Sequence, residues 1–429
     1  MKATTSFLKR RSFLKAGALA GAPCVIPARL LGSKSPSNTI TLGFIGMGGQ
    51  GTGRNLGTFL HEKDCRALAV CDVKTPHARR AKDKVDKQYK NSDCTVHRDF
   101  REVIARDDLD AIVISTPDHW HVPMSLMALR AGKDVFSEKP SLTIVEGRAL
   151  ATEVARRKAI FQWGIEDRSL VKYHRLAGWA RSGAIGDLEE IHVSLAHKKA
   201  LPKDKPTAVP EDLDWNLWLG PAPFRPYEAS ITGPQNWRNI TDYSGGSLTD
   251  WGAHLVDTAQ IGAGMDASGP IEVSGSSREL EAGKWQSNAP TNYTLEYTYA
   301  NGVKMFVKDA GVDIRFVGSK GWVKCSGWNG TWKASDEKIF KIKEFGREAR
   351  FWPRPDIEHR DFLDSMKSRK PTAYHPEAGH RLFSALHLGH IAIHTGKKVT
   401  WDPVKESFGD PELVKNFIYR RESRDWASA

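Results

Sequence analysis

Residues 40–51 read Ile40-Thr-Leu-Gly-Phe-Ile-Gly46-Met47-Gly48-Gly-Gln-Gly51, a short apolar run followed at once by a glycine-rich turn. A helical pattern (52–60) comes next, and then a second apolar run (67–71) that ends in Asp72. This order predicts a strand, a glycine turn, a helix and a strand. Such a unit begins a doubly wound parallel sheet, in which helices connect neighbouring strands.

The glycine turn has the spacing of a dinucleotide site. Gly46 permits the tight turn, Gly48 lets the backbone approach a pyrophosphate, and Gly51 lets helix and strand pack closely. The start of the following helix offers unpaired N–H groups and the positive end of the helix dipole to phosphates. Asp72 stands where a carboxylate accepts hydrogen bonds from ribose hydroxyls. We therefore predict that NAD binds at Gly46, Met47, Gly48, Gly51 and Asp72.

The residues around Asp72 leave the choice of coenzyme partly open. Asp72 favours NAD, because its carboxylate suits free ribose hydroxyls. Lys74 and Arg79 lie nearby in the sequence and could accept the 2′-phosphate of NADP instead. We expect NAD, with NADP as the alternative.

The size and composition of the chain limit its class. With 429 residues the chain exceeds one ordinary hydrophobic core, which predicts two domains. Hydrophobic residues make up 40% and the mean hydropathy is −0.46, values typical of a soluble globular protein. Half of the net charge of +12 comes from residues 1–32, which hold no acid and six basic residues: Lys2, Lys9, Arg10, Arg11, Lys15 and Arg29. The rest has no basic run with interleaved aromatic residues, so no nucleic-acid partner is expected.

The first residues resemble a twin-arginine export signal. The run Lys9-Arg10-Arg11-Ser-Phe-Leu-Lys15 precedes a weakly apolar stretch (16–26) that is too short to span a bilayer permanently. Cys24 follows Pro23, which does not suit lipoprotein cleavage, so no stable membrane anchor is expected. We predict that residues 1–32 are a signal peptide read by the twin-arginine translocase. The folded protein, with its cofactor bound, would then reach the bacterial periplasm.

The pattern changes along the chain and suggests domain boundaries. A polar linker (33–38) leads into alternating strands and helices, which we interpret as an NAD(P)-binding domain over residues 39–163. A second α/β domain for substrate and oligomerisation is expected over residues 164–400, and a polar tail over residues 401–429. The elements expected in this second domain are helices 171–181 and 375–394 and strands 190–196, 271–276, 291–299, 303–308, 313–317 and 322–325.

One strand of the second domain shows how its sheet is covered. Tyr293, Leu295, Tyr297 and Tyr299 alternate with polar residues and therefore share one face. This pattern predicts an open, mostly antiparallel sheet with one covered side. The uncovered side is expected to pair with another subunit, giving a homo-oligomer.

Two turns follow neighbouring strands of the first domain and carry polar residues. Thr116-Pro-Asp-His-Trp-His121 ends one strand, and Ser137-Glu138-Lys139-Pro140 ends another. Ligands of doubly wound sheets bind outside the carboxyl ends of the strands. The ammonium of Lys139 could there bind a substrate hydroxyl and stabilise negative charge as its proton leaves. An ordinary surface lysine in a turn is the alternative.

A second candidate lies in a glycine-rich helix start, residues 245–257. Asp250 and His254 stand four residues apart and share one helical face, which suits a general base held by a carboxylate. A capping Asp with a structural His, or two metal ligands, are alternatives. His119 and His121 could complete a zinc site only if the domains close in that way, and no Cys pair has zinc spacing. We predict no metal.

Together these features resemble the glucose–fructose oxidoreductase / inositol dehydrogenase (Gfo/Idh/MocA) family over nearly the whole chain after Asn38, in a secreted branch. The resemblance rests on the glycine turn with Asp72, the Thr116–His121 turn, Glu138-Lys139-Pro140, and the helix start with Asp250 and His254. It implies an N-terminal Rossmann domain, a doubly wound parallel sheet, followed by a C-terminal α/β domain with an open antiparallel sheet that commonly forms dimers or tetramers.

The resemblance also implies hydride transfer between a nicotinamide dinucleotide and a hydroxyl of a sugar or polyol. By that likeness the catalytic residues are Lys139, His254 as general acid or base, and Asp250 as its partner. The residues expected at the nicotinamide end are Thr116, Pro117, His121, Glu138 and Lys139. Asp118 departs from the family, which often has Asn there, so the role of this position is open.

The remaining predictions concern the carbohydrate pocket and rival functions. Residues 162–168 and His197 are plausible contributors, and the substrate residues we predict are Arg168, Tyr173, Trp237 and Arg238. Trp and Tyr can stack on a sugar ring, although most such residues belong to the core. Two rivals to a dehydrogenase remain: a glycosidase that uses bound NAD transiently, and a non-catalytic sugar sensor.

Overall fold

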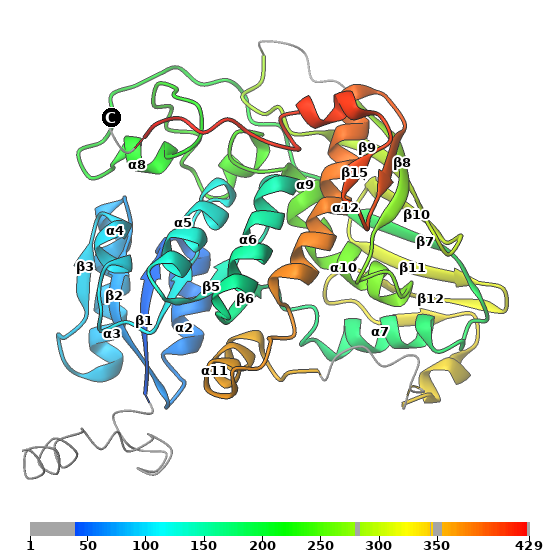
Figure 1. Cartoon of the computed structure of the whole chain (residues 1–429), viewed down its shortest axis with the longest axis horizontal. Coiled ribbons are helices and arrows are strands. Elements are labelled where there is room, and N and C mark those ends of the chain that lie inside the picture. The colour runs from blue at the N-terminus through cyan, green and yellow to red at the C-terminus, as the bar shows by residue number, and fades with distance from the viewer. Residues whose placement is uncertain (1–38, 279–283, 344, 346–353, 427–429) are drawn as a thin grey trace, which may run out of the picture. The chain divides into compact units, whose positions relative to one another are not determined.

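The computed structural model describes residues 39–278, 284–343, 345 and 354–426 (Figure 1). The predicted signal peptide (1–32) and linker (33–38) lie outside the described residues. Residues 40–429 form one compact unit. Within the described ranges, no helix is long and apolar enough to cross a membrane.

The first domain is built on a six-stranded sheet whose strands all run parallel. The strands are β1 (Ile40–Ile45), β2 (Cys65–Cys71), β3 (Thr95–His97), β4 (Ala111–Ile114), β5 (Asp134–Glu138) and β6 (Phe161–Gly164). Their order is β3-β2-β1-β4-β5-β6, which confirms the predicted doubly wound fold. The order reverses between β1 and β4, so a ligand crevice is expected at their carboxyl ends.

Helices connect these strands as the sequence predicted. They are a π-helical turn η3 (Gly51–Asn55) continued by α2 (Leu56–Phe59), then α3 (Thr75–Tyr89), α4 (Phe100–Ile104), α5 (Asp118–Arg130) and α6 (Ile144–Arg157). Helix α5 begins at Asp118, within the stretch 116–121 that was predicted as a turn. Pro117 is extended (φ −61°, ψ 155°) and ends the turn, and the Asp118 carboxylate in the first helical turn suits the positive end of the helix dipole.

The second domain contains a nine-stranded sheet of order β13-β12-β11-β7-β10-β9-β8-β14-β15. Its strands are β7 (Leu188–Leu195), β8 (Pro270–Arg278), β9 (Thr291–Tyr299), β10 (Lys304–Asp309), β11 (Asp313–Gly318), β12 (Gly321–Ser326), β13 (Trp332–Ala334), β14 (Val399–Asp402) and β15 (Ser407–Phe408). Only the β7–β10 pair of this order is parallel. The sheet is therefore mixed and mostly antiparallel, which confirms the predicted fold class.

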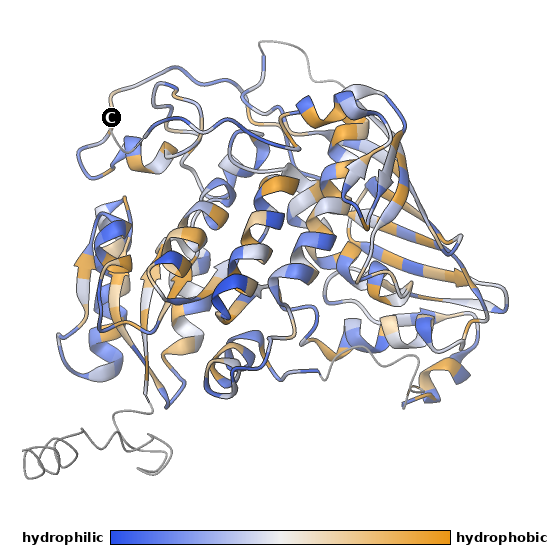
Figure 2. Ribbon diagram, in the orientation of Figure 1, coloured by the Kyte–Doolittle hydropathy of each residue, from blue (hydrophilic) through white to orange (hydrophobic). Residues whose placement is uncertain are grey.

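One face of this sheet is covered by helices. The helices and short turns after β6 are α7 (Val171–Arg181), α8 (Trp215–Leu219), η4 (Asn236–Asn239), α9 (Gly246–Asp250), α10 (Gly252–Gly262), η5 (Glu337–Lys341), α11 (Glu358–Ser368), α12 (Pro376–Thr395) and η7 (Pro411–Lys415). Tyr293, Leu295, Tyr297 and Tyr299 are all buried, as predicted. Figure 2 shows hydrophobic residues interspersed with hydrophilic ones along these strands and helices, as expected for elements with one covered face.

Residues 401–426, predicted as a polar tail, are part of the folded structure. Trp401 and Phe408 are buried in β14 and β15 at the edge of the second sheet. Further on, the Trp426 ring lies 4.8 Å from that of Trp120 in α5, and Arg424 donates to Asn216 at 2.8 Å. The prediction missed this because a few well-spaced aromatic side chains, in a polar stretch without periodicity, anchor the segment.

Arg168, predicted to contact substrate, is instead buried in a bidentate ion pair with Asp257 of α10. Its Nε and Nη2 atoms donate to the carboxylate at 3.0 and 2.8 Å, and Nη1 donates to the carbonyl of Ala373. The guanidinium also lies 4.1 Å above the Tyr374 ring. Burial disfavours the charge, but the Asp257 carboxylate outweighs it and raises the pKa of Arg168. The structure thus gives Arg168 a structural role, joining the segment after β6 to α10.

Replacing Arg168 by Met leaves the Asp257 carboxylate buried without its cation. We expect the free energy of unfolding to fall by about 3–5 kcal/mol, the usual cost of an uncompensated buried charge, as measured by urea denaturation. As a control, Lys304→Met breaks an exposed ion pair with Glu296 and should leave the denaturation midpoint unchanged. A fall no larger than that of the control would contradict the structural role.

Candidate active site

The glycine turn has the geometry that a dinucleotide requires. Gly46 has φ +87°, and a Cβ atom there would lie 2.6 Å from the carbonyl carbon of Ser115, so only glycine fits. A Cβ at Gly51 would overlap the carbonyl oxygen of Gly46. Around Gly48, by contrast, nothing lies within 4 Å of a Cβ position, which leaves its backbone open to a ligand. These three environments match the three predicted roles.

Asp72 connects this turn to the end of β2. Its carboxylate accepts hydrogen bonds from the backbone N–H of Met47 at 2.7 Å and of Lys74 at 2.8 Å. Oδ2 also lies 3.4 Å from His77 Nδ1, and each carboxylate oxygen has two lone pairs, so Oδ1 keeps a site for a further donor. Asp72 is therefore held rigidly and can still accept a bond from a ribose hydroxyl.

His121 joins the turns that follow β4 and β5. Its Nε2 lies 2.8 Å from the carbonyl oxygen of Thr116, and its Nδ1 lies 3.0 Å from that of Pro140. Burial lowers the pKa of His121 to about 4, so the ring is neutral at physiological pH. A neutral imidazole carries one N–H, so His121 donates to one of these carbonyls and only contacts the other. The predicted nicotinamide-end residues Thr116, Pro117 and His121 thus lie together, with His121 between the two turns.

Glu138 links the end of β5 to the glycine turn. Its Oε1 accepts hydrogen bonds from the side-chain amides of Asn55 at 2.9 Å and Gln50 at 3.0 Å. The Oδ1 of Asn55 in turn accepts a hydrogen bond from His359 Nε2 of α11 at 2.9 Å. This network places Glu138 beside the helix that starts the dinucleotide site.

Asp250 receives three cations from separate elements. Its Oδ1 accepts from Lys139 Nζ at 2.7 Å, its Oδ2 accepts from Lys198 Nζ at 2.6 Å, and Arg238 Nε lies 3.3 Å from Oδ1. Lys139 also donates to the Asp250 carbonyl at 2.8 Å. Burial opposes the carboxylate charge, but the three cations outweigh it and hold the pKa of Asp250 well below its usual range. Asp250 therefore fixes the catalytic lysine predicted from the sequence.

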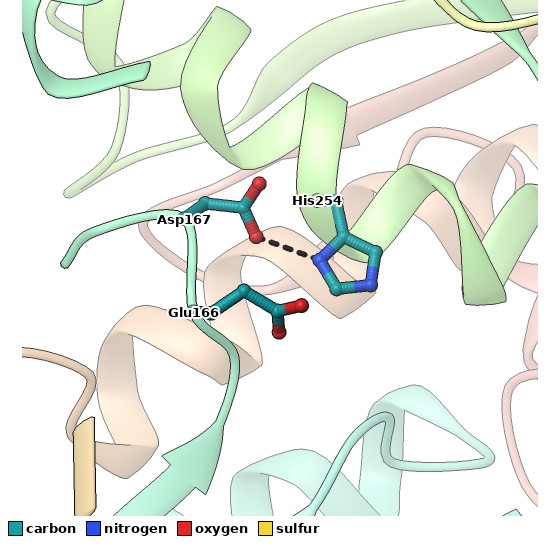
Figure 3. A group of neighbouring side chains, drawn as sticks. All are labelled: Glu166, Asp167 and His254. Carbon is teal, nitrogen blue, oxygen red and sulfur yellow. Dashed lines mark hydrogen bonds and ion pairs between the residues drawn. The ribbon is translucent and has the colours of Figure 1, made fainter. Parts of the chain in front are cut away.

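The predicted pairing of Asp250 with His254 is wrong, because His254 is paired with Asp167. The Nδ1 atom of His254 lies 2.7 Å from Asp167 Oδ2 (Figure 3). Helix α9 ends at Asp250 and α10 begins at Gly252, and the Asp250 carboxylate turns to its cations. Asp167 lies in the stretch predicted to line the sugar pocket, but nothing in its local sequence marked it as the partner of His254.

A second carboxylate lies beside this pair. Figure 3 shows Glu166 and Asp167 facing His254, and one potential ligand atom of each lies within 4.8 Å of the others. Burial lowers the pKa of His254, but the charge of Asp167 outweighs this, so the pKa is raised overall. Burial likewise opposes the Glu166 charge, but His254 and Arg54 lower its pKa below the usual value. The group combines a proton-binding imidazole with an ionised carboxylate.

These three side chains could also hold a metal ion, which the sequence did not predict. The Asp167–His254 hydrogen bond already engages one ligand atom of each residue. The arrangement therefore supports an acid–base pair, and the prediction of no metal is kept as a prediction.

Asp118, the position that departs from the resembling family, is buried at the start of α5. Its Oδ2 accepts a hydrogen bond from the hydroxyl of Ser244 at 2.6 Å. Burial raises the pKa of Asp118 to about 7, although the charge of Arg238 opposes this. At neutral pH the carboxyl is thus partly protonated, and a protonated carboxyl can donate a hydrogen bond, as an Asn amide does.

Two buried histidines of α12 hold the loops that carry Lys139 and Asp250. His387 Nε2 lies 2.9 Å from the carbonyl oxygen of Ser141, and His390 Nε2 lies 2.7 Å from that of Gly245. Burial lowers the pKa of His387 to about 3 and that of His390 to about 4, so both are neutral donors. The sequence gave no sign of these contacts, since both residues simply fall on the buried face of a helix.

Aromatic residues surround His254 and Arg238. The Trp328 ring lies 5.1 Å from the His254 ring, and Tyr173, predicted to contact substrate, packs 5.0 Å from Trp328. Tyr173 is buried and donates a hydrogen bond to the carbonyl of Trp328 at 3.3 Å, so it helps to hold Trp328 in place. Trp237 stacks with Arg238 at 4.4 Å. Arg238 reaches Asp250 and Trp237 packs against Arg238, while their contact with substrate stays a prediction. Trp328 was missed because it stands in a loop between strands.

Two family models match this chain in succession. Residues 40–165 match the NAD-binding Rossmann fold of an oxidoreductase family, and residues 181–428 match the C-terminal alpha/beta domain of that family. The chain belongs to the Gfo/Idh/MocA oxidoreductase family. This confirms the family resemblance seen in the sequence, and the Rossmann domain agrees with the predicted NAD or NADP site.

Relatives and solved structures resemble the chain to different extents. A glycosyl hydrolase family 109 protein of Shewanella baltica is 29% identical over 176 residues, 35% of this chain and 37% of that protein. The alpha-N-acetylgalactosaminidase of Shewanella oneidensis is 33% identical over 114 residues, 25% of this chain and 24% of that protein. The chain thus spans about a third of the length of these curated relatives, or less.

Solved structures match over much more of the chain, at low identity. The WlbA dehydrogenase of Bordetella pertussis, in complex with NADH and UDP-GlcNAcA, has a TM-score of 0.63 at 15% identity and covers 84% of this chain and 98% of that chain. An aldose-aldose oxidoreductase of Caulobacter crescentus has a TM-score of 0.60 at 17% identity, covering 84% and 99%. At such identities the likeness shows the fold.

Asp167→Asn should lower the pKa of His254, because it removes the negative charge that raises this pKa. The ring protons of His254, followed by NMR over a pH titration, report the shift directly. Asp250→Asn is the matched control and should change the pKa of His254 less, since Asp250 faces the cations instead. An equal or larger fall in the control variant would contradict the assignment of Asp167 as partner.

Proposed function

We propose that this protein is an oxidoreductase that transfers a hydride between a tightly bound NAD, or NADP, and a CH–OH group of a sugar, glycoside or polyol. The observation that carries the proposal is the meeting of Lys139, from the end of β5, with Asp250 and His254 from the second domain. Lys139 follows β5, which lies next to β4 at the point where the strand order reverses, and it binds Asp250 and acts electrostatically on His254. Ligands of such sheets bind at the carboxyl ends of these strands.

The residues present fit a dinucleotide. The backbone around Gly48 is open, and the turn is held by Asp72. At the other end of the crevice, the buried hydroxyl oxygen of Thr116 has no hydrogen-bond partner among the described residues, which suits a polar group of a ligand. When bound, the nicotinamide supplies a hydride acceptor or donor.

His254 is the proton acceptor in this proposal. The Asp167 carboxylate accepts a hydrogen bond from His254 Nδ1–H, which leaves Nε2 to take the proton of the substrate hydroxyl. Lys139, held by Asp250, stabilises the oxygen as negative charge develops on it. Glu166 stays ionised beside His254 and favours its protonated form.

We also propose that the cofactor stays bound through export. Residues 1–32 resemble a twin-arginine signal, so the translocase would carry the folded protein to the periplasm, which keeps no NAD pool. Helix α11 supports retention: Glu358 pairs with Arg54 and His359 contacts Asn55, both in the turn helix of the dinucleotide site. The uncovered face of the nine-stranded sheet is our proposed surface for a dimer or tetramer.

Retention predicts that protein passed through gel filtration still releases about one dinucleotide per chain when denatured, as identified by mass spectrometry. Gly46→Ala should lose the cofactor, because its Cβ would meet the Ser115 backbone. Gly269→Ala is the control: its Cβ would make only an ordinary contact with Pro403 at 3.6 Å, so the cofactor should stay. Cofactor-free wild-type protein would argue against tight binding.

Lys139→Met should reduce hydride transfer by about a hundredfold or more, because it removes the ammonium that stabilises the reacting oxygen. The rate is followed by the absorbance of the reduced nicotinamide after mixing with sugar. Lys133→Met is a matched control, since Lys133 is also buried but precedes β5, at the opposite end of the strand. Full activity of the Lys139 variant would overturn the proposed function.

A second function is an NAD-dependent glycosidase, and the family 109 relatives favour it. The presence of an acid–base pair apart from Lys139 also suits proton transfer at a neighbouring carbon. Products separate the functions when the protein is mixed with glycosides. A keto-sugar with an equal amount of reduced cofactor means a dehydrogenase, and released aglycone means a glycosidase. Binding of a glycoside without either product would indicate a non-catalytic sugar sensor.

A further inference from the structure

Three cations share the Asp250 carboxylate in direct ion pairs, whereas Glu138 and Asp118 act on Arg238 from farther away. Lys139, Lys198 and Arg238 all approach one carboxylate, at 2.7, 2.6 and 3.3 Å. These side chains are 8, 14 and 22% exposed, so they are largely withdrawn from water. Cations held away from water are costly unless matched by anions. One carboxylate offsets only one of the three.

Neighbouring carboxyl groups do not pair with the extra cations. Glu138 gives its Oε1 to the amides of Asn55 and Gln50, and Asp118 accepts from Ser244. Among the described residues, Lys198 and Arg238 form ion pairs only with Asp250. Their charges are thus available to a bound molecule.

Arg238 has the geometry of an oxyanion receptor. Its guanidinium lies 4.4 Å above the Trp237 ring, which fixes its plane, and it reaches Asp250 through Nε. No contact of its two terminal amino groups with a described residue is found in the structure. A guanidinium presents such groups as a fork that fits both oxygens of a carboxylate, sulfate or phosphate.

The cations also lie next to the reacting group. Lys198 and Lys139 bind the two oxygens of the same carboxylate, so an anion at Lys198 lies within one sugar ring of the hydroxyl at Lys139. A neutral sugar offers only hydroxyls to Lys198 and Arg238. An acidic sugar brings a second anion to these two cations, which otherwise share one carboxylate, and fixes which hydroxyl reaches Lys139.

We propose that the substrate is an anionic carbohydrate whose carboxylate or sulfate group binds Arg238 and Lys198. This substrate class rests on the proposed function, because it refines the site of hydride transfer. The acidic group acts as an anchor, and the ring then presents a hydroxyl between Lys139 and His254.

The test uses the protein with its cofactor bound and matched pairs of sugars. Calorimetry compares methyl glucuronide with methyl glucoside, methyl galacturonide with methyl galactoside, and glucose 6-sulfate with glucose. The acid of at least one pair should bind about tenfold more tightly or better, as expected for charge-assisted hydrogen bonds. Preference for the uronides identifies a carboxylate, and preference for the sulfate identifies a sulfate ester. Equal binding within all three pairs would overturn the inference.

Variants separate anion recognition from a merely structural role. Arg238→Gln and Lys198→Gln should each lower the affinity for the acid by about tenfold and leave that for its neutral partner nearly unchanged. If the two residues only hold Asp250 in place, both sugars of a pair will lose affinity equally, which would count against the proposal. Lys199→Gln removes the same charge from an exposed neighbour and should have no effect.

The experiment distinguishes failure of the anion site from failure of the proposed hydride transfer. Preferential binding of an acid that is never oxidised would support the anion site and contradict the proposed function. Oxidation of neutral and acidic sugars at equal efficiency would support the proposed function and contradict the anion site. Circular dichroism of both Gln variants confirms that each one is folded before its affinities are compared.

Discussion

The ion pair between Lys139 and Asp250 is the contact on which the site depends. Lys139 follows the last residue of β5 in the parallel sheet, whereas Asp250 ends α9 in the second domain. The bond therefore fixes the reacting end of the dinucleotide crevice against the residues that handle substrate. Because Asp250 stays ionised and Lys139 is largely buried, the pair is held by charge as well as by geometry.

Buried histidines take two different states around this contact, and the difference has one cause. The hydrogen-bond partners of the His121, His387 and His390 rings are backbone carbonyls, so burial keeps these rings neutral and each donates one hydrogen bond. His254 is equally buried but faces Asp167, and a carboxylate at 2.7 Å outweighs the cost of burying a charge. Of these four histidines, His254 is therefore the one whose pKa is raised and not lowered.

The crevice is electrostatically polarised between these two groups. Lys198 and Arg238 place cations on one side, whereas Glu166 and Asp167 place carboxyl groups beside His254. A substrate with an acidic group would be oriented by this asymmetry, because reversing it would bring like charges together. Orientation of this kind lets one hydroxyl of several react. A sugar pocket that contacts only hydroxyls selects among them less strictly.

Local patterns in the sequence determined the elements of this protein, since β9 and α7 have the predicted bounds and the glycine turn has the predicted geometry. Those patterns depend on neighbours within a few residues, which the sequence displays directly. Tertiary structure alone decided the pairing of side chains. His254 pairs with Asp167, which lies 87 residues away in the sequence, and Arg168 pairs with Asp257. Charge competition in three dimensions made these choices, because each buried carboxylate binds the cations that the fold brings nearest.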